Sequence, residues 1–329
     1  QHLSQSGRLL VDVFIPLRRL RQPSAAPALR VDTVDPVTLD RVRGWNVYTI
    51  DERLQIEARD QSFEVTRRCL DQLRAEGVTS LNTDLVYGLP HQTMARLEDT
   101  IDKTLSLAPD RVALFGYAHV PWVAKRQKLI REATLPDAVA RYHFAEKAAA
   151  RFAASGMEAI GIDHFATPQD GLTQAKNNRR LRRNFQGYTV DNSDALIGLG
   201  GSAIGQTKNG YVQNIVATGQ YQAAIDNGDL AIAKGVELSD VDRARGWVIE
   251  KLMCDFKFDI DQFVQRFGDL APTILNDAGY IAAADQDDFV YITHDTFGLS
   301  DKGKPFVRAI AAQFDTYFGQ GNARHSKAV

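Results

Sequence analysis

Acidic and imidazole side chains fall where the chain leaves predicted strands. Asp84 lies within the apolar run 79–87, Tyr117–His119 belong to the run 111–121, and Asp163 and His164 end the run 157–165. In sheets built from alternating strands and helices, working residues gather where strands end and loops begin, so we expect these side chains at such ends. A carboxylate such as Asp84 could accept hydrogen bonds from a ribose hydroxyl, bind a metal ion or satisfy loop amides, and the residues alone leave these alternatives open.

A metal site is one alternative. His119, Asp163 and His164 carry the nitrogen and oxygen ligands of barrel metal hydrolases. The sequence has no H-x-H or H-E-x-x-H spacing, and single histidines at loop mouths are more often structural. The hydrolase therefore stays a minor hypothesis.

A basic and aromatic segment follows at 177–189. Guanidinium groups bind carboxylate or phosphate through two parallel hydrogen bonds, and aromatic rings could flank a flat ligand. The alternative is a solvated basic loop. The candidate substrate residues are Arg179, Arg180, Arg182, Arg183, Asn184, Gln186 and Tyr188.

A glycine-rich run, 197–205, could bring backbone close to a ligand. It lacks the lysine and the spacing of a phosphate-binding loop. We expect it to form a tight turn from a strand into a helix.

The elements that would position these residues alternate. Helices are predicted from about residue 60 to Gly77, from Thr93 as N-cap, and from Pro136 at the first helical position to about Gly156. The strands 79–87, 111–121 and 157–165 lie between them. This alternation predicts βαβ units and a parallel sheet.

A different unit begins near residue 232. Ser239 is expected to cap a helix through Leu252, followed by two short helices ending near Gly268 and Gly279 and a hairpin strand at 289–295. A last helix is expected over 300–318. This order resembles a winged helix. A DNA-binding role is disfavoured, because 263–281 contains one Arg and no Lys.

Composition narrows the class of protein. The chain has 329 residues, 44% hydrophobic and 24% charged, enough for two domains or a barrel with an appendage. Its net charge of −2 argues against a protein that binds nucleic acid or membrane surfaces in general. Two cysteines give neither a disulfide framework nor a metal spacing. With no transmembrane run or signal-peptide pattern, a soluble cytoplasmic protein is expected.

Six motifs together carry a family resemblance: NTDLVYGLPHQT, FGYAHVP, IGIDHFATP, RRNFQGYT, GLGGSAIG and YVQN. In this order and spacing they resemble the oxygen-independent coproporphyrinogen III oxidases (dehydrogenases), which are radical S-adenosylmethionine enzymes. The resemblance runs from about Arg59 to about Phe318, and NFQGYT favours the dehydrogenase over the related haem-chaperone group. It implies an α/β fold, a partial (β/α) barrel of radical S-adenosylmethionine type with a small helical, winged-helix-like C-terminal domain.

The resemblance also implies site residues. Arg59, Asp84, Ala118 and Ile204 match positions that contact S-adenosylmethionine, with Asp84 on a ribose hydroxyl. From charge we infer that the arginine cluster serves the carboxylates of coproporphyrinogen III. Arg182 departs from the family, which usually has His there.

A larger departure lies upstream of about residue 51. The family holds a 4Fe-4S cluster in a C-x3-C-x2-C loop, because the cluster needs thiolate ligands, and this chain has no such loop. GGGTP and G-V-Q-D-F stretches are absent too. A sequence translated from the middle of a gene, with its first fifty residues out of frame, would show this pattern. We therefore leave 1–50 unassigned, place the C-terminal part of the barrel at 51–231 and a helical domain at 232–329, and expect no metal ligands in this chain.

The resulting functional hypothesis is oxidative decarboxylation of coproporphyrinogen III to protoporphyrinogen IX by the full-length enzyme, with S-adenosylmethionine and a 4Fe-4S cluster. We expect this chain alone to be inactive. The expected partners are the substrate and an electron donor. We expect a monomer that binds neither nucleic acid nor a membrane. A non-catalytic tetrapyrrole- or haem-binding protein is the second hypothesis, and the metal hydrolase is the third.

Overall fold

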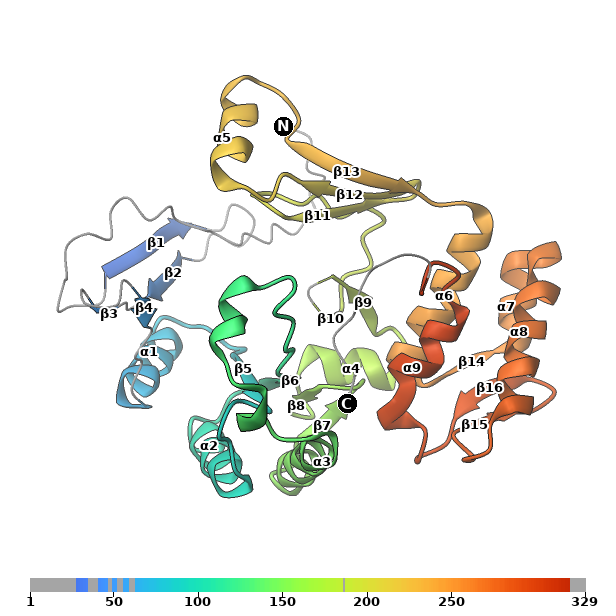
Figure 1. Ribbon diagram of the computed structural model, residues 1–329, viewed down its shortest axis with the longest axis horizontal. Helices are drawn as coiled ribbons and strands as arrows, with labels where there is room; N and C mark the ends of the chain where they lie inside the picture. The colour runs from blue at the N-terminus through green and yellow to red at the C-terminus, as the bar shows by residue number, and fades with distance from the viewer. Residues whose placement is uncertain are drawn as a thin grey trace. The chain divides into compact units, whose positions relative to one another are not determined.

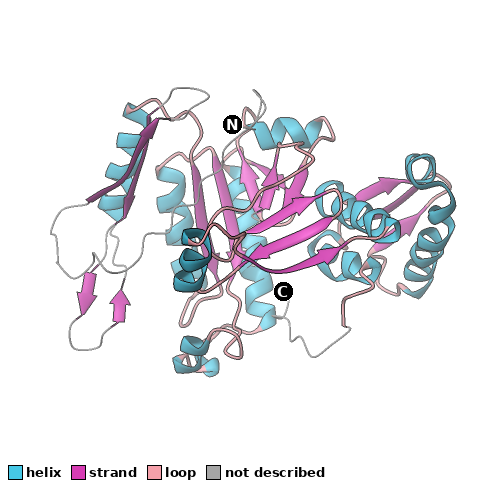
Figure 2. Cartoon of the chain, turned by 90° about the horizontal axis from the view of Figure 1, so that it is seen from above, coloured by secondary structure: helices cyan, strands magenta, loops and turns pink. Residues whose placement is uncertain are grey.

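The computed structural model describes residues 28–34, 41–46, 49–51, 56–58, 63–185 and 187–319. Helices and strands are both spread through this part of the chain (Figure 2). The chain divides into two compact units, the first made of Gln1–Thr79 and Asp194–Glu237 and the second of Ser80–Ser193 and Leu238–Val329. The domain boundaries that the sequence suggested at 51 and 232 stay a prediction.

A four-stranded sheet organises the second unit. Its order is β5-β6-β8-β7, with bounds Asn82–Tyr87 for β5, Arg111–Gly116 for β6, Glu158–Ile160 for β7 and His164–Ala166 for β8. β5 and β6 are parallel, whereas β8 pairs antiparallel with both β6 and β7. The predicted parallel sheet is therefore confirmed for β5 and β6 and wrong for β7 and β8. The run 157–165 is not one strand, because Gly161 adopts φ +58° and the chain turns back.

Two helices cover one face of this sheet, α2 (Met94–Ser106) and α3 (Ala138–Ala154), which lie side by side in Figure 1. Their buried side chains form one core with the outer face of the strands. This core contains Tyr87, Leu97, Ile101, Val112, Leu114, Phe144, Ala148, Phe152, Met157 and Phe165. The helices therefore fix the strands from behind.

Local signals set the ends of these helices. The Thr93 side chain accepts a hydrogen bond from the Arg96 N–H at 3.3 Å, as predicted for the N-cap of α2. Asp137 is the N-cap of α3, and its side chain accepts a hydrogen bond from the Ala140 N–H at 2.8 Å. Pro136 therefore precedes the cap, and its predicted first helical position is wrong. Gly156 follows α3 with φ +89°, as a helix stop requires.

The other face of the sheet is covered only in part. Over β7 and β8 lie α4 (Gly171–Asn177) and a hairpin of β9 (Arg182–Asn184) and β10 (Gly187–Thr189). A second core forms there, of Ile160, Ala166, Leu172, Ala175, Leu181, Tyr188 and Cys254. On β5 the alternate residues Asn82, Asp84 and Val86 are exposed. Two short 3-10 turns, η2 (Lys125–Leu129) and η3 (Glu132–Thr134), follow β6.

The C-terminal part of the second unit combines helices with a small antiparallel sheet, as a winged helix does. The sheet has the order β14-β16-β15. The elements are α6 (Asp240–Asp255), β14 (Lys257–Asp259), α7 (Ile260–Phe267), η4 (Gly268–Leu270), α8 (Ala271–Ala284), β15 (Val290–Ile292), β16 (Thr296–Leu299), η5 (Lys304–Phe306), α9 (Val307–Ala311) and η6 (Ala312–Phe314).

Sequence signals in this region were partly misleading. Ser239 caps α6 as predicted, and α7 ends at Phe267 with Gly268 as its C-cap. α8 continues beyond Gly279 to Ala284, and Ile281 and Ala282 in this continuation pack against the core. The predicted helix 300–318 is wrong, since only short helical turns over 304–314 form.

The first unit contains α1 (Phe63–Ala75), which ends in a Schellman motif at Gly77, with the Val78 N–H donating to the Leu73 carbonyl at 3.1 Å. Its remaining elements are β1 (Ala28–Val34), β2 (Arg41–Asn46), β3 (Thr49–Asp51), β4 (Ile56–Ala58), β11 (Ile204–Thr207), β12 (Gly210–Asn214), α5 (Thr218–Asp226) and β13 (Ile232–Glu237). The glycine-rich run 197–205 leads into strand β11 and not into a helix, which corrects the prediction.

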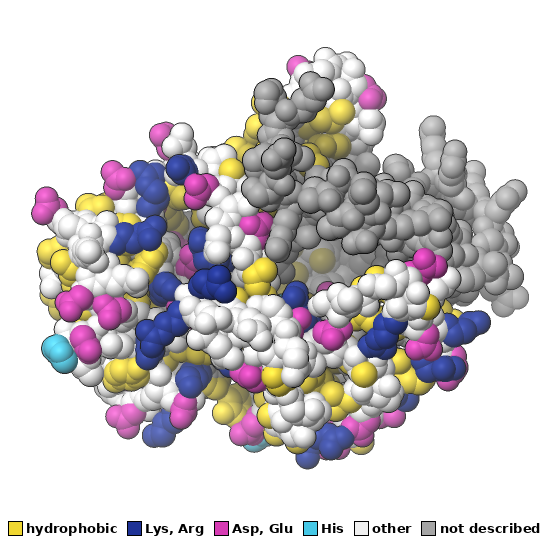
Figure 3. Space-filling model, turned by 180° about the vertical axis from the view of Figure 1, so that it is seen from behind, with side chains coloured by type: hydrophobic (Ala, Val, Ile, Leu, Met, Phe, Trp, Pro, Cys, Tyr) yellow, Lys and Arg dark blue, Asp and Glu magenta, His cyan; other side chains and the backbone are white. Residues whose placement is uncertain are grey.

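Surface charge is mixed. On the face drawn in Figure 3, Lys and Arg side chains are interspersed with Asp and Glu, as expected for a net charge of −2. Within the described residues, no helix has both the length and the apolar character needed to cross a bilayer.

Candidate functional site

Asp84, Ala113 and His164 form a row across the sheet. Asp84 is paired with Ala113 in the parallel ladder, and Ala113 is paired with His164 in the antiparallel one. Paired side chains point to the same face, so the carboxylate and the imidazole flank the small Ala113 side chain on the partly open face. Two strand spacings place their backbones about 10 Å apart. Asp84 is therefore in mid-strand, which corrects its predicted place at a strand end.

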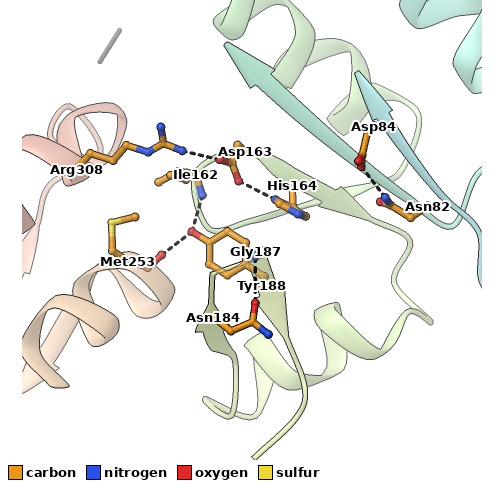
Figure 4. A network of polar contacts seen from close by, with 10 residues as sticks. All are labelled: Asn82, Asp84, Ile162, Asp163, His164, Asn184, Gly187, Tyr188, Met253 and Arg308. Carbon is orange, nitrogen blue, oxygen red and sulfur yellow. Dashed lines mark hydrogen bonds and ion pairs between the residues drawn. The ribbon is translucent and has the colours of Figure 1, made fainter. Parts of the chain in front are cut away.

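The Asp84 carboxylate is exposed. The Asn82 side-chain amide donates to its Oδ1 at 2.7 Å (Figure 4). An ionised carboxylate has about four acceptor positions on its two oxygens, and one amide hydrogen bond uses one of them. Asp84 can therefore accept further hydrogen bonds from a ligand with adjacent hydroxyl groups.

A buried charged network surrounds His164. The Asp163 carboxylate lies 2.7 Å from His164 Nδ1 through one oxygen and 2.7 Å from an Arg308 guanidinium nitrogen through the other (Figure 4). Asp163 and His164 are each 9% exposed, and Arg308 comes from α9 in the C-terminal part of the same unit. Both oxygens of the buried Asp163 carboxylate are therefore partnered, as burial of a carboxylate requires.

Aromatic rings enclose the imidazole. Phe115 and Tyr188 meet His164 edge to face, with ring centroids 5.8 and 5.2 Å away. The ring plane of His164 is thus held by packing as well as by Asp163.

Tyr188 joins three segments of the chain. Its hydroxyl donates to the Met253 carbonyl at 2.8 Å and accepts from the Ile162 N–H at 3.1 Å (Figure 4). Its ring packs on Gly161, where an added Cβ would come within 2.0 Å of it. Burial raises the pKa of Tyr188 to about 12. The hydroxyl is thus engaged by backbone, and Tyr188 supports the site from within the core.

The rest of the NFQGYT segment forms the hairpin turn. The Asn184 side chain accepts from the Gly187 N–H at 3.2 Å, and Phe185 is 52% exposed. Gln186 lies outside the described residues. The substrate role predicted for Asn184 and Gln186 stays a prediction.

The predicted arginine cluster divides among different partners. Arg182 pairs with Glu250 of α6 at 2.6 Å, while the Arg183 guanidinium lies 5.0 Å from the centroid of the Tyr188 ring. Arg179 and Arg180 are exposed after α4. A shared carboxylate-binding role of the four arginines stays a prediction, and Arg183 contacts Tyr188, one of the rings that pack on His164.

The loop after β6 is held by Gln127. Its side chain donates to the Ala118 carbonyl at 3.0 Å and accepts from the Val120 N–H at 2.5 Å. The His119 ring approaches Glu132 at 3.7 Å. Among the described residues, His, Cys, Asp and Glu side chains form no group of three suited to a metal ion, and the structure thus offers the hydrolase hypothesis no site.

Of the four residues predicted to contact S-adenosylmethionine, the second unit contains Asp84 and Ala118. Arg59 lies outside the described residues. Ile204 opens β11 in the first unit, where it pairs with Gln213, whereas Asp84 and Ala118 belong to the second. The predicted S-adenosylmethionine contacts of all four residues stay predictions.

Sequence reasoning missed Arg308 and Glu250. Each reaches a partner more than sixty residues away, 145 residues for Arg308 to Asp163 and 68 for Glu250 to Arg182, so no local pattern marked them. Gly161 did carry a signal, since a glycine inside an apolar strand pattern often marks a kink or a close backbone approach.

The fold resembles that of a known enzyme. A solved structure of coproporphyrinogen III oxidase from Escherichia coli, described as a radical SAM enzyme, superposes with a TM-score of 0.74 and 35% identity, covering 79% of this chain and 60% of that one. The oxygen-independent coproporphyrinogen III oxidase of Paracoccus denitrificans is 42% identical over 310 residues, 93% of this chain and 68% of the relative. The chain belongs to the oxygen-independent coproporphyrinogen III oxidase family.

Membership of the coproporphyrinogen III oxidase family confirms the resemblance and the mixed α/β fold that it implied. The anaerobic coproporphyrinogen III oxidase 1 of Cereibacter sphaeroides is 47% identical over 273 residues, covering 82% of this chain but 60% of the relative. The chain thus spans about 60% of the length of the first relatives it matches. No model of a known protein family matches the chain.

Proposed function

We propose that the whole protein carries out the oxygen-independent oxidative decarboxylation of coproporphyrinogen III to protoporphyrinogen IX. The observation that carries this proposal is the exposed Asp84 carboxylate, on the partly open sheet face of a chain from this family. In the net reaction each of two propionate groups loses a hydrogen atom, CO2 and one electron and becomes a vinyl group.

S-adenosylmethionine fits the donor and acceptor chemistry of Asp84. A ribose diol offers two O–H donors to a carboxylate that already holds one amide donor, Asn82. When bound, S-adenosylmethionine supplies the radical that takes the hydrogen atom. Asp84 would orient the nucleoside over the sheet, and Ala118 lies in the loop that follows the neighbouring strand.

A 4Fe-4S cluster does not fit the cysteines of this chain. The chain has two cysteines, Cys69 and Cys254, and cluster ligation requires thiolates. Cys254 is 3% exposed, and burial raises the pKa of its thiol to about 12; burial also raises the pKa of Cys69. We propose that the chain alone forms no 5′-deoxyadenosine.

A chimera tests the function. The part of the Cereibacter sphaeroides relative that precedes the matched region would be joined to this chain at about residue 51 and reconstituted anaerobically with iron and sulfide. With S-adenosylmethionine, a reductant and coproporphyrinogen III, the chimera should form 5′-deoxyadenosine and protoporphyrinogen IX, and this chain alone should form neither. A chimera that holds the cluster but makes no protoporphyrinogen would contradict the proposal.

Calorimetric titration of the chain with S-adenosylmethionine tests the role of Asp84. A hydrogen bond to a charged group contributes about 1.5–3 kcal/mol, and the lower value applies to this exposed carboxylate, so Asp84→Asn should weaken binding about tenfold. Asp99→Asn is the control, since Asp99 is exposed on α2 behind the sheet. Equal affinities for the two variants would remove Asp84 from the site.

The second candidate is a non-catalytic tetrapyrrole-binding protein, which the count of two cysteines favours. It predicts tight coproporphyrin binding together with no product from the chimera. An electron donor, a monomeric state and a cytoplasmic location belong to the main proposal, and light scattering after gel filtration tests the monomer.

A further inference from the structure

One nitrogen of His164, Nε2, lies beside Gly187 of the NFQGYT hairpin, and the His164 side chain is 11% exposed. A Cβ placed on Gly187 would lie 3.3 Å from His164 Nε2 and 3.4 Å from its Cε1. A side chain at position 187 would therefore begin against the imidazole and cover this edge of the ring. Glycine at position 187 leaves that edge of His164 without a covering side chain.

The other nitrogen of the ring is already committed. Asp163 lies 2.7 Å from Nδ1, and because an ionised carboxylate only accepts, Nδ1–H must be the donor. Arg308 holds the second oxygen of Asp163, so the carboxylate cannot turn away from the ring without losing that ion pair. Nε2 is thus the atom of His164 left to meet a ligand, with its direction set by Asp163 and Arg308.

The surroundings favour an anionic ligand. The Arg183 guanidinium lies over the ring of Tyr188, and the same ring meets His164 edge to face. The row Asp84–Ala113–His164 places this position on the same sheet face as the proposed nucleoside contact, about two strand spacings away. A negatively charged arm that reached Nε2 would thus lie beside the nucleoside and between aromatic rings.

We propose that His164 binds a propionate carboxylate of the tetrapyrrole substrate through Nε2, and that Asp163 and Arg308 are positioning residues for it. This inference rests on the proposed function. In the bound state the ring is an imidazolium that donates Nδ1–H to Asp163 and Nε2–H to the propionate.

Fluorescence titration with coproporphyrin III, the air-stable oxidised form of the substrate, tests the inference on the chain itself. His164→Asn keeps a donor near the Nδ1 position for Asp163 but has no atom at Nε2. We expect it to bind coproporphyrin III about tenfold more weakly than the unaltered chain, and to bind coproporphyrin III tetramethyl ester, which has no free carboxylate, equally well. His294→Asn is the matched control, since the His294 side chain is 93% exposed.

A second measurement needs no variant in the titration. The imidazoles of the chain are labelled with nitrogen-15, and the Nε2 resonance of His164 is assigned by its loss in His164→Asn. Addition of coproporphyrin III should shift this resonance, and addition of the tetramethyl ester should not. If the unaltered chain binds no coproporphyrin III, the proposed function and this inference both fall. If it binds, but His164→Asn binds equally well and the Nε2 resonance stays in place, the inference alone is wrong.

Discussion

Removal of one oxygen atom from Tyr188 should weaken the second unit measurably. In Tyr188→Phe the ring remains against Gly161, but the Met253 carbonyl loses its donor at 2.8 Å and the Ile162 N–H loses its acceptor at 3.1 Å. Tyr188 is 8% exposed, so little solvent is available to replace either partner. The substitution thus isolates two hydrogen bonds without creating a cavity of side-chain size.

Each hydrogen bond contributes about 1 kcal/mol net, and an unsatisfied buried partner costs about 1–3 kcal/mol. We therefore expect Tyr188→Phe to lower the free energy of unfolding by about 2–4 kcal/mol. In urea, with a slope of about 2 kcal/mol per molar, the midpoint falls by roughly 1–2 M. Tyr280→Phe is the control, because Tyr280 is 75% exposed on α8 and should shift the midpoint little.

The pH dependence gives this prediction a sign. Burial raises the pKa of Tyr188 from 10.0 to about 12, so between these values the unfolded chain releases the Tyr188 proton and the folded chain keeps it. The stability that Tyr188 contributes is fully present below pH 10 and is lost as pH rises through 12, by up to about 3 kcal/mol. The gap between the unaltered chain and Tyr188→Phe should therefore narrow from pH 9 to pH 12. A midpoint unchanged at neutral pH, or a gap that widens with pH, would refute the reasoning.

Two further predictions concern the same unit. Gly161→Ala should lower the free energy of unfolding by about 3 kcal/mol or more, because the new Cβ would lie 2.0 Å from the Tyr188 ring at a residue with φ +58°. Gly279→Ala in α8 is the control: its Cβ would meet no described atom within 4 Å outside the helix's own backbone, and it should raise the free energy of unfolding by about 0.5–1 kcal/mol. Urea midpoints that move in the same direction for the two variants would contradict this prediction. Ser239→Ala removes a capping box and should cost about 1 kcal/mol in thermal unfolding. Because hydrogen bonds from Ser239 are the main cause that lowers the pKa of Asp242, the same variant should raise that pKa in a carboxyl-carbon NMR titration, and an unmoved pKa would count against it.

Local signals predicted the parts of the fold that local forces determine. Thr93 and Ser239 were recognised as caps because a capping side chain reaches only three residues along the chain. The turn at Gly161 was read as continuous strand, because the run around it stays apolar and the ring that the glycine accommodates comes from Tyr188, 26 residues after Ile162.

The candidate site was predictable to a similar extent. Asp84 and His164 were singled out from the sequence, and the structure places them in one row across the sheet. Arg308 was not, because no local pattern on the five-residue helix α9 identifies a buried aspartate 145 residues earlier as its partner. Residues that position others through long-range ion pairs are the ones that sequence patterns miss.

The bonds from α6 and α9 to the hairpin and to the β7–β8 turn affect how the protein is made. Met253, Glu250 and Arg308 belong to the part that begins at Leu238, and the segments they hold precede Ser193. On the ribosome, those segments emerge before their partners exist. At synthesis rates of roughly 5–20 residues per second, residues 238–329 take about 5–20 s. During that interval the half-built sheet exposes the apolar surface that α6 will cover, so a nascent chain stalled before Leu238 is the form in which chaperone binding and aggregation should be greatest.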